Sequence, residues 1–100
     1  MSKSVRYNRK CQIDLRKLTE QQRAECFEKI ESLERGEISG KALQDKNDMD
    51  LEGYYSLYFD NAKLRIIYEK KPEGFKIIAI GKRNNFEVHK EALVRIKSKQ

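Results

Sequence analysis

The feature that most constrains the fold of this chain is a set of three short apolar runs in its second half. They cover residues 54–59, 64–68 and 75–80, and all three are rich in aromatic or β-branched residues. Turn-forming residues separate the runs, with Asp60 and Asn61 in the first gap and Pro72 in the second. Runs of this length between turn signals predict antiparallel strands joined by hairpins.

Alternation along the first of these strands assigns its side chains to two faces of the sheet. The more apolar set, which we expect to face the core, is Tyr55, Leu57 and Phe59. The other set, which places two phenols and a hydroxyl on the opposite face, is Tyr54, Ser56 and Tyr58.

Two helices are predicted before the strands, as a hairpin that packs on the sheet. The first covers residues 10–18, and its candidate inward residues are Cys11, Ile13 or Leu15, and Leu18. The second covers residues 20–35, opens with a capping box of Thr19 and Gln22, and ends before Gly36. Its inward face is expected to consist of Arg23, Cys26, Phe27, Ile30 and Leu33.

The remaining segments complete a predicted α+β fold in one domain, residues 1–100. Residues 4–7 are expected to form an N-terminal edge strand, and residues 38–53 a long connection with one turn of helix around 41–43. Asn84 and Glu87 have the spacing of a second capping box, which opens a C-terminal helix. The apolar face of that helix consists of Val88, Ala92 and Ile96, flanked by His89 and Leu93. The predicted sheet is a three-stranded meander.

Composition argues against several classes of protein. Cys11 and Cys26 are the only cysteines, they are far apart, and the chain has one histidine. We therefore expect no metal site, no disulfide framework and no cofactor. There is no signal peptide and no apolar run near 18 residues, so we expect a cytoplasmic protein without a membrane partner.

The net charge of +6 is unevenly distributed along the chain. Residues 1–19 carry six Lys and Arg against one Asp, whereas residues 20–53 carry five against ten acidic residues. The excess is positive again in residues 54–81 and 82–100. This asymmetry suits a polyanion or an acidic protein partner on one face. The alternative on charge alone is a domain with solvated basic ends.

Four residues together could carry chemistry: Arg65, Lys82, Arg83 and His89. Each also has a structural interpretation, namely an ion-paired or exposed Arg65, a solvated turn at Lys82 and Arg83, and a packing role for His89. Taken together, arginines around a phosphate and a histidine that transfers protons suit the cleavage of an RNA phosphodiester.

The second half of the chain resembles the C-terminal signature of the RelE/ParE superfamily of toxins. The resemblance rests on Leu-Arg-Ile-Ile-Tyr at 64–68, Ile-Ala-Ile-Gly-Lys-Arg at 78–83, Glu-Val-His at 87–89, and Ala92 with Arg95. It covers the whole chain in outline and is strongest over residues 50–96. It implies a small bacterial toxin that is paired with an acidic antitoxin.

Within the superfamily, RelE-type members cut mRNA in the ribosomal A site. The resemblance to them implies that Arg65 and Arg83 stabilise the phosphorane and that His89 transfers protons as the 2′-OH attacks the phosphate. Lys82, Tyr58 and Lys63 are expected to bind RNA. Some members carry lysines at the positions of Ser56 and Tyr58, one of them proposed as the general base. Their absence here leaves open whether the general base is His89 or another group. The first candidate among the other groups is Tyr58.

The resemblance leaves two alternatives to an mRNA-cleaving toxin. ParE-type members inhibit DNA gyrase by binding, and a non-toxic relative could bind nucleic acid. Only the nuclease requires the set of Arg65, Arg83 and His89. The expected partners of the nuclease are the antitoxin, mRNA and the ribosomal A site, with DNA contacted only through the antitoxin.

Overall fold

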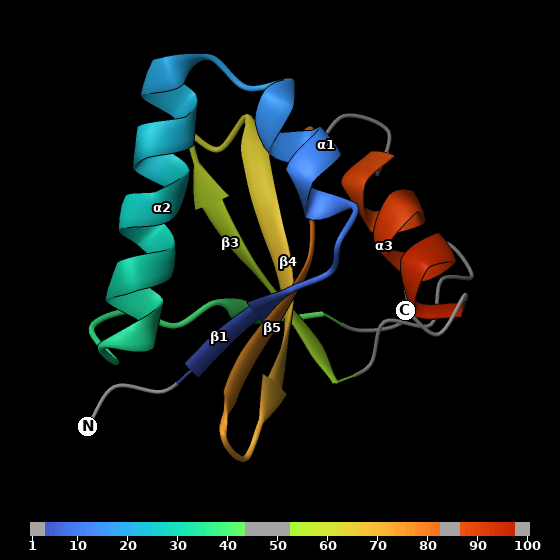
Figure 1. Cartoon of the computed structure of the whole chain (residues 1–100). Coiled ribbons are helices and arrows are strands. Elements are labelled where there is room, and N and C mark those ends of the chain that lie inside the picture. The colour runs from blue at the N-terminus through green and yellow to red at the C-terminus, as the bar shows by residue number, and fades with distance from the viewer. Residues whose placement is uncertain (1–3, 44–52, 83–86, 98–100) are drawn as a thin grey trace.

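A five-stranded sheet forms the centre of the molecule, in the order β1-β5-β4-β3-β2 (Figure 1). The computed structural model describes residues 4–43, 53–82 and 87–97. β3 (Tyr54–Phe59), β4 (Leu64–Lys71) and β5 (Gly74–Lys82) pair antiparallel in sequence order. The predicted α+β class and the predicted meander are therefore confirmed, although the sheet has more strands than the sequence suggests.

β1 (Ser4–Tyr7) is an edge strand, as expected, and it pairs parallel with β5. This pairing brings the two backbones together at Gly74, where a Cβ atom would collide with the Ser4 carbonyl group. A glycine is therefore required at this point of close approach.

β2 (Lys41–Ala42) forms the other edge and pairs antiparallel with β3. The turn of helix predicted around residues 41–43 is therefore wrong. The segment is held extended from both ends, because the Gly40 N–H donates to Tyr68 Oη at 2.7 Å and the Leu43 N–H donates to the Tyr54 carbonyl at 2.8 Å. These partners lie on β4 and β3, so no local pattern shows them.

Helices cover both faces of the sheet. α1 (Cys11–Arg16) and α2 (Glu20–Glu34) pack on one face, and α3 (Glu87–Lys97) packs on the other (Figure 1). The core on the α1/α2 side includes Cys26, Ile30, Leu33, Leu57, Phe59, Ile66 and Tyr68. The smaller core under α3 includes Ile67, Ile78, Ala79, Val88 and Ala92. Within the described residues, no helix is long and apolar enough to cross a membrane.

The predicted ends of α2 are confirmed. Thr19 and Gln22 form the capping box, and Gly36 adopts a φ of 77° after the last turn. Phe27, expected to face inward, is 38% exposed, so that expectation is wrong. Successive helical residues are about 100° apart, so Phe27 turns away from the sheet when Cys26 faces it.

α1 differs from its prediction in length and in its buried face. It ends at Arg16, and of the two alternatives Ile13 is 49% exposed whereas Leu15 packs partly buried against the core. Asp14 lies between them in the chain and is buried. An acidic residue therefore occupies an inward position of α1.

A register shift interrupts the pairing of β4 with β5. It follows Ile67 and leaves Ile78 as an extra residue in β5, as in a β-bulge. Ile77 and Ile80 consequently both face the α1/α2 core, while Ile78 and Ala79 face α3.

The two cysteines, Cys11 of α1 and Cys26 of α2, form no disulfide and are buried in the core between these helices and the sheet. Burial, with a smaller contribution from the Asp14 carboxylate, raises the pKa of the Cys11 thiol to about 12. Burial also raises the pKa of the Cys26 thiol to about 12. Neither thiol is therefore ionised near neutral pH in the folded protein.

These thiols predict a loss of stability in alkali. Above a pH of about 8.5 the unfolded chain loses its thiol protons while the folded protein keeps them, so unfolding becomes more favourable as the pH rises towards about 12. Each thiol should lower the free energy of unfolding by roughly 1.4 kcal/mol per pH unit in that window. Urea unfolding at a series of pH values measures this slope.

The double variant Cys11→Ala/Cys26→Ala is the control, because the tyrosines and lysines that also titrate in alkali are still present. Its slope should be shallower than that of the wild type by the contribution of two thiols. An equal slope in both proteins would show that the thiols titrate normally when folded.

Candidate functional site

Arg65 lies at the centre of a cluster that joins β3, β4 and α3. In the sheet it pairs with Tyr58 of β3 and Gly81 of β5, so the three residues share the face that α3 covers. Arg65 Nη2 donates to Tyr58 Oη at 2.6 Å, and the guanidinium carbon lies 4.3 Å from the centre of the Tyr58 ring. Arg65 Nη1 lies 3.2 Å from His89 Nε2 of α3. The structure thus brings together Tyr58, Arg65 and His89.

The contact with Arg65 determines which form of His89 fits the site. A guanidinium carries only donors, so the hydrogen bond requires a lone pair on His89 Nε2. The imidazole is then neutral, with its proton on Nδ1. This form is inferred from the chemistry of the partner. In this form the acceptor of the imidazole is Nε2, the atom that faces Arg65.

The cluster is graded from buried to exposed. His89 is 4% exposed, Arg65 is half-buried, and Tyr58 is 39% exposed. The phenol ring therefore presents the cluster to solvent, while the imidazole is held beneath it.

The other residues predicted for the site lie apart from this cluster or outside the described residues. Lys82 pairs with Leu64, whose side chain belongs to the α1/α2 core, so Lys82 leaves the sheet on the face opposite Arg65. Lys63 is exposed in the turn before β4. Arg83 lies outside the described residues.

Lys41 is a cation on the site face that sequence reasoning missed. It pairs with Ser56, which shares a face with Tyr58 two residues further along β3, and Lys41 is exposed. The sequence offers no signal for this placement, because β2 has two residues and depends on partners in β3 and β4.

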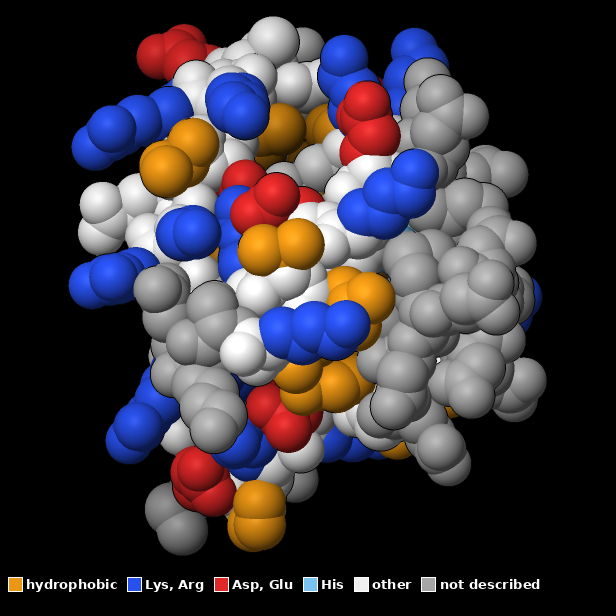
Figure 2. Space-filling model, turned by 90° about the vertical axis from the view of Figure 1, so that its right-hand side faces the viewer, with side chains coloured by type: hydrophobic (Ala, Val, Ile, Leu, Met, Phe, Trp, Pro, Cys, Tyr) orange, Lys and Arg blue, Asp and Glu red, His pale blue; other side chains and the backbone are white. Residues whose placement is uncertain are grey.

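A groove of about 570 Å³ separates α1 from α3. Its apolar residues are Ile13, Leu18, Leu64, Ala79, Ile80 and Val88. The charged residues along it are Lys10, Lys17, Lys82, Glu87 and Glu91, with Asp14 and Arg95 at its base. Figure 2 shows this side of the molecule, where basic side chains border a recessed hydrophobic area.

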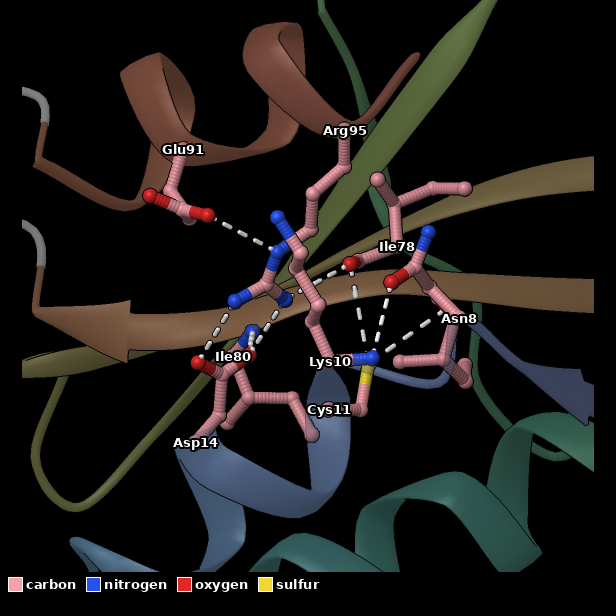
Figure 3. Close-up of polar contacts among 9 residues, drawn as sticks. Asn8, Lys10, Cys11, Asp14, Ile78, Ile80, Glu91 and Arg95 are labelled. Atoms are coloured by element: carbon pink, nitrogen blue, oxygen red, sulfur yellow. Dashed lines mark hydrogen bonds and ion pairs between the residues drawn. The ribbon is translucent and has the colours of Figure 1, made fainter. Parts of the chain in front are cut away.

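A buried ion pair, which sequence reasoning also missed, crosses the base of this groove (Figure 3). Asp14 of α1 and Arg95 of α3 are 8% and 3% exposed. The sequence does contain a signal that both side chains face inward. Asp14 follows Cys11 by three residues and Arg95 follows Ala92 by three, and residues at this spacing share one face of a helix. A charged residue on an apolar helix face requires a buried partner of opposite charge.

The described residues contain no group of His, Cys, Asp and Glu that could hold a metal ion.

Several solved structures of one toxin are similar to this chain. A variant of the E. coli toxin RelE in the free state is 24% identical with a TM-score of 0.71, over 96% of this chain and 99% of that one. RelE in complex with a peptide of the antitoxin RelBc is 22% identical with a TM-score of 0.65, over 92% and 95%. The chain has the RelE fold.

A third RelE structure, from the intact E. coli RelBE toxin–antitoxin complex, is 20% identical with a TM-score of 0.63, over 84% of this chain and all of that one. No family model matches the sequence, and no curated protein does either. The likeness to RelE therefore establishes the fold, and the chemistry rests on the cluster around Arg65.

The geometry predicts the proton position on His89. In ¹⁵N-correlated NMR spectra near neutral pH, His89 should give the pattern of a neutral ring protonated on Nδ1, because Nε2 accepts from Arg65. In Arg65→Ala the donor is gone, so the ring should move towards a mixture of forms. Arg35→Ala, which removes an exposed arginine of the α2 C-cap, should leave the spectrum unchanged. Equal His89 signals in the Arg65→Ala variant and the wild type would contradict the contact.

Proposed function

We propose that this chain is the toxin of a type II toxin–antitoxin system and acts as a ribosome-dependent endoribonuclease on mRNA. The observation that carries the proposal is the contact of Arg65 with both Tyr58 and His89 on the α3 side of the sheet. The RelE fold supports it, since RelE is described as a toxin and has been solved with its antitoxin.

In this proposal Arg65 binds the scissile phosphate. A guanidinium matches the geometry of phosphate oxygens, and it stabilises the negative charge that grows on them as the phosphorane forms. Tyr58 and a neutral His89 are uncharged ligands, so these two contacts orient the guanidinium without neutralising it. Arg83 is proposed to add a second guanidinium.

His89 is the proposed general base. When Nη1 of Arg65 turns to a phosphate oxygen, His89 Nε2 is released to take the proton of the upstream 2′-OH. The 2′-oxygen then bonds to phosphorus, and the bond from phosphorus to the 5′-oxygen breaks. The products are a 2′,3′-cyclic phosphate and a 5′-hydroxyl.

Tyr58 is proposed to complete the proton balance and to bind RNA. Its Oη accepts from Arg65 and keeps its own proton, which it can donate to the departing 5′-oxygen. Its exposed ring also offers a surface on which a base can stack. Lys41, Lys63 and Lys82 are exposed cations that would attract the rest of the RNA strand and the ribosome. The proposed location of this activity is the cytoplasm.

Single-turnover cleavage of mRNA on programmed ribosomes tests this mechanism. His89→Gln keeps hydrogen bonding but cannot act as the base, so it should slow cleavage by about 10²–10⁴-fold. Arg65→Ala should cost roughly 10²–10³-fold because one donor to the developing charge is lost. Arg83→Ala should also abolish toxicity, with little loss of stability. Arg35→Ala is the matched control and should cleave at the wild-type rate.

The same variants distinguish the proposal from a toxin that inhibits by binding. If folded Arg65→Ala and His89→Gln proteins still arrest growth, or if mRNA stays intact while gyrase is inhibited, the nuclease proposal is wrong. If only His89→Gln cleaves normally, His89 is a packing residue and Tyr58 becomes the first candidate for the base.

The antitoxin is proposed to be acidic and to cover the basic side of the molecule, namely the groove between α1 and α3 and the surface of α3. The affinity of the complex should fall as salt is added, because screening weakens charge attraction. Lys10→Gln/Lys17→Gln should bind less tightly and show a weaker salt dependence, as measured by titration calorimetry. A complex formed only through the acidic surface of α2, with the groove still accessible, would contradict this proposal.

A further inference from the structure

The helix that carries His89 is fixed by a directional contact at its other end. Arg95 makes a two-pronged pair with Asp14 of α1, with Nη1 2.6 Å from Oδ2 and Nη2 2.9 Å from Oδ1 (Figure 3). Both residues are buried. Two parallel hydrogen bonds hold the guanidinium and the carboxylate in one plane. The pair therefore restricts the relative rotation of the two groups as well as the distance between them.

Both partners are also tied to β5. The Ile80 N–H donates to Asp14 Oδ2 at 3.0 Å, and Arg95 Nη1 donates to the Ile78 carbonyl at 3.0 Å. Ile78 is the extra residue at the register shift, so its carbonyl is turned out of the regular ladder. The pair therefore links α1, β5 and α3 at a single point.

Apart from the polar contacts of Arg95 and His89, the described part of α3 packs on the sheet through apolar side chains. Val88 and Ala92 lie on Ile67, Ile78 and Ala79. Apolar packing is non-directional, and it permits a small rotation or sliding of a helix at little cost. The 3.2 Å contact of His89 with Arg65 does not tolerate such a shift, since a hydrogen bond weakens steeply with geometry.

We propose that Arg95, held by Asp14, is a positioning residue that sets the rotation of α3 and so places His89 against Arg65. The catalytic consequence rests on the proposed nuclease function, but the placement of His89 does not. Buried ion pairs can often be replaced by neutral groups of similar volume without loss of stability, so we expect the charge of this pair to matter less than its direction. The pair adds directional hydrogen bonds, which fix the orientation of α3 in a way that the apolar contacts do not.

The central experiment separates direction from stability. Asp14→Asn/Arg95→Met removes both charges, fills a similar volume and keeps an acceptor for the Ile80 N–H. Urea unfolding should show that the double variant is close to the wild type, while Arg95→Met alone is less stable because it leaves a buried carboxylate unpaired. Arg95→Lys keeps the charge but replaces two prongs with one ammonium.

Two readouts then report on His89. In the double variant and in Arg95→Lys, the His89 ring signals should shift towards those of Arg65→Ala. Single-turnover cleavage at saturating ribosomes should slow by up to about 10²-fold, since a misplacement near 1 Å can cost that much, while the ribosome concentration for half-maximal rate stays unchanged. Arg35→Ala is the control, because Arg35 pairs with Glu31 and Glu37 at an exposed position after α2 and should alter neither readout.

Wild-type His89 signals and wild-type cleavage in a stably folded double variant would overturn the proposal, because the pair would then contribute only to stability. If the double variant does not fold, the His89 signals of Arg95→Lys decide the question in the same way. Absence of cleavage by the wild-type protein would refute the nuclease function, whereas the His89 spectra would still test the role of Arg95.

Discussion

The register shift between β4 and β5 is the constraint on which the arrangement of the helices depends. β5 lies between β1 and β4 and contacts both α1 and α3. One extra residue at Ile78 changes which side chains of the strand face each layer, so β5 can serve two cores. It also directs a backbone carbonyl at Arg95 and at the Cys11 thiol, which lies 3.5 Å away. Backbone irregularity therefore supplies the polar partner that two buried side chains need.

Two guanidinium groups contact α3 or belong to it, and their surroundings differ. Arg95 lies near the C-terminal end of the helix, and Arg65 of β4 contacts His89 near its N-terminal end. At Arg95 burial alone lowers the pKa, but the hydrogen bonds and charge of Asp14 more than offset this, and the net pKa is raised. That cation is satisfied inside the protein. At Arg65 the contacts with Tyr58 and His89 involve uncharged groups. The two environments match the two proposed roles, in which Arg95 positions a helix and Arg65 binds the phosphate of the substrate.

Much of the cluster could be predicted from sequence. Arg65 follows from a cation within an apolar strand, and His89 from its place at the border of an apolar helix face. Tyr58 follows from strand alternation, which assigns it to the face opposite Phe59. Lys82 was expected in the site because it follows the third predicted strand closely in the sequence. That position does not determine which face of the sheet the Lys82 side chain lies on. Its pairing with Leu64 turns it away from Arg65.

The sequence by itself determined most of the helices and strands of this protein. Local signals are sufficient for a meander separated by turn residues, for a capping box at Thr19, and for a glycine after α2, because each depends on neighbours within a few residues. Only the tertiary structure decided that residues 41–42 form a strand, that Asp14 and Arg95 meet across 81 residues, and that Arg65 contacts His89. These contacts join elements far apart in the chain, and burial makes their polar partners obligatory only after the helices have packed on both faces of the sheet.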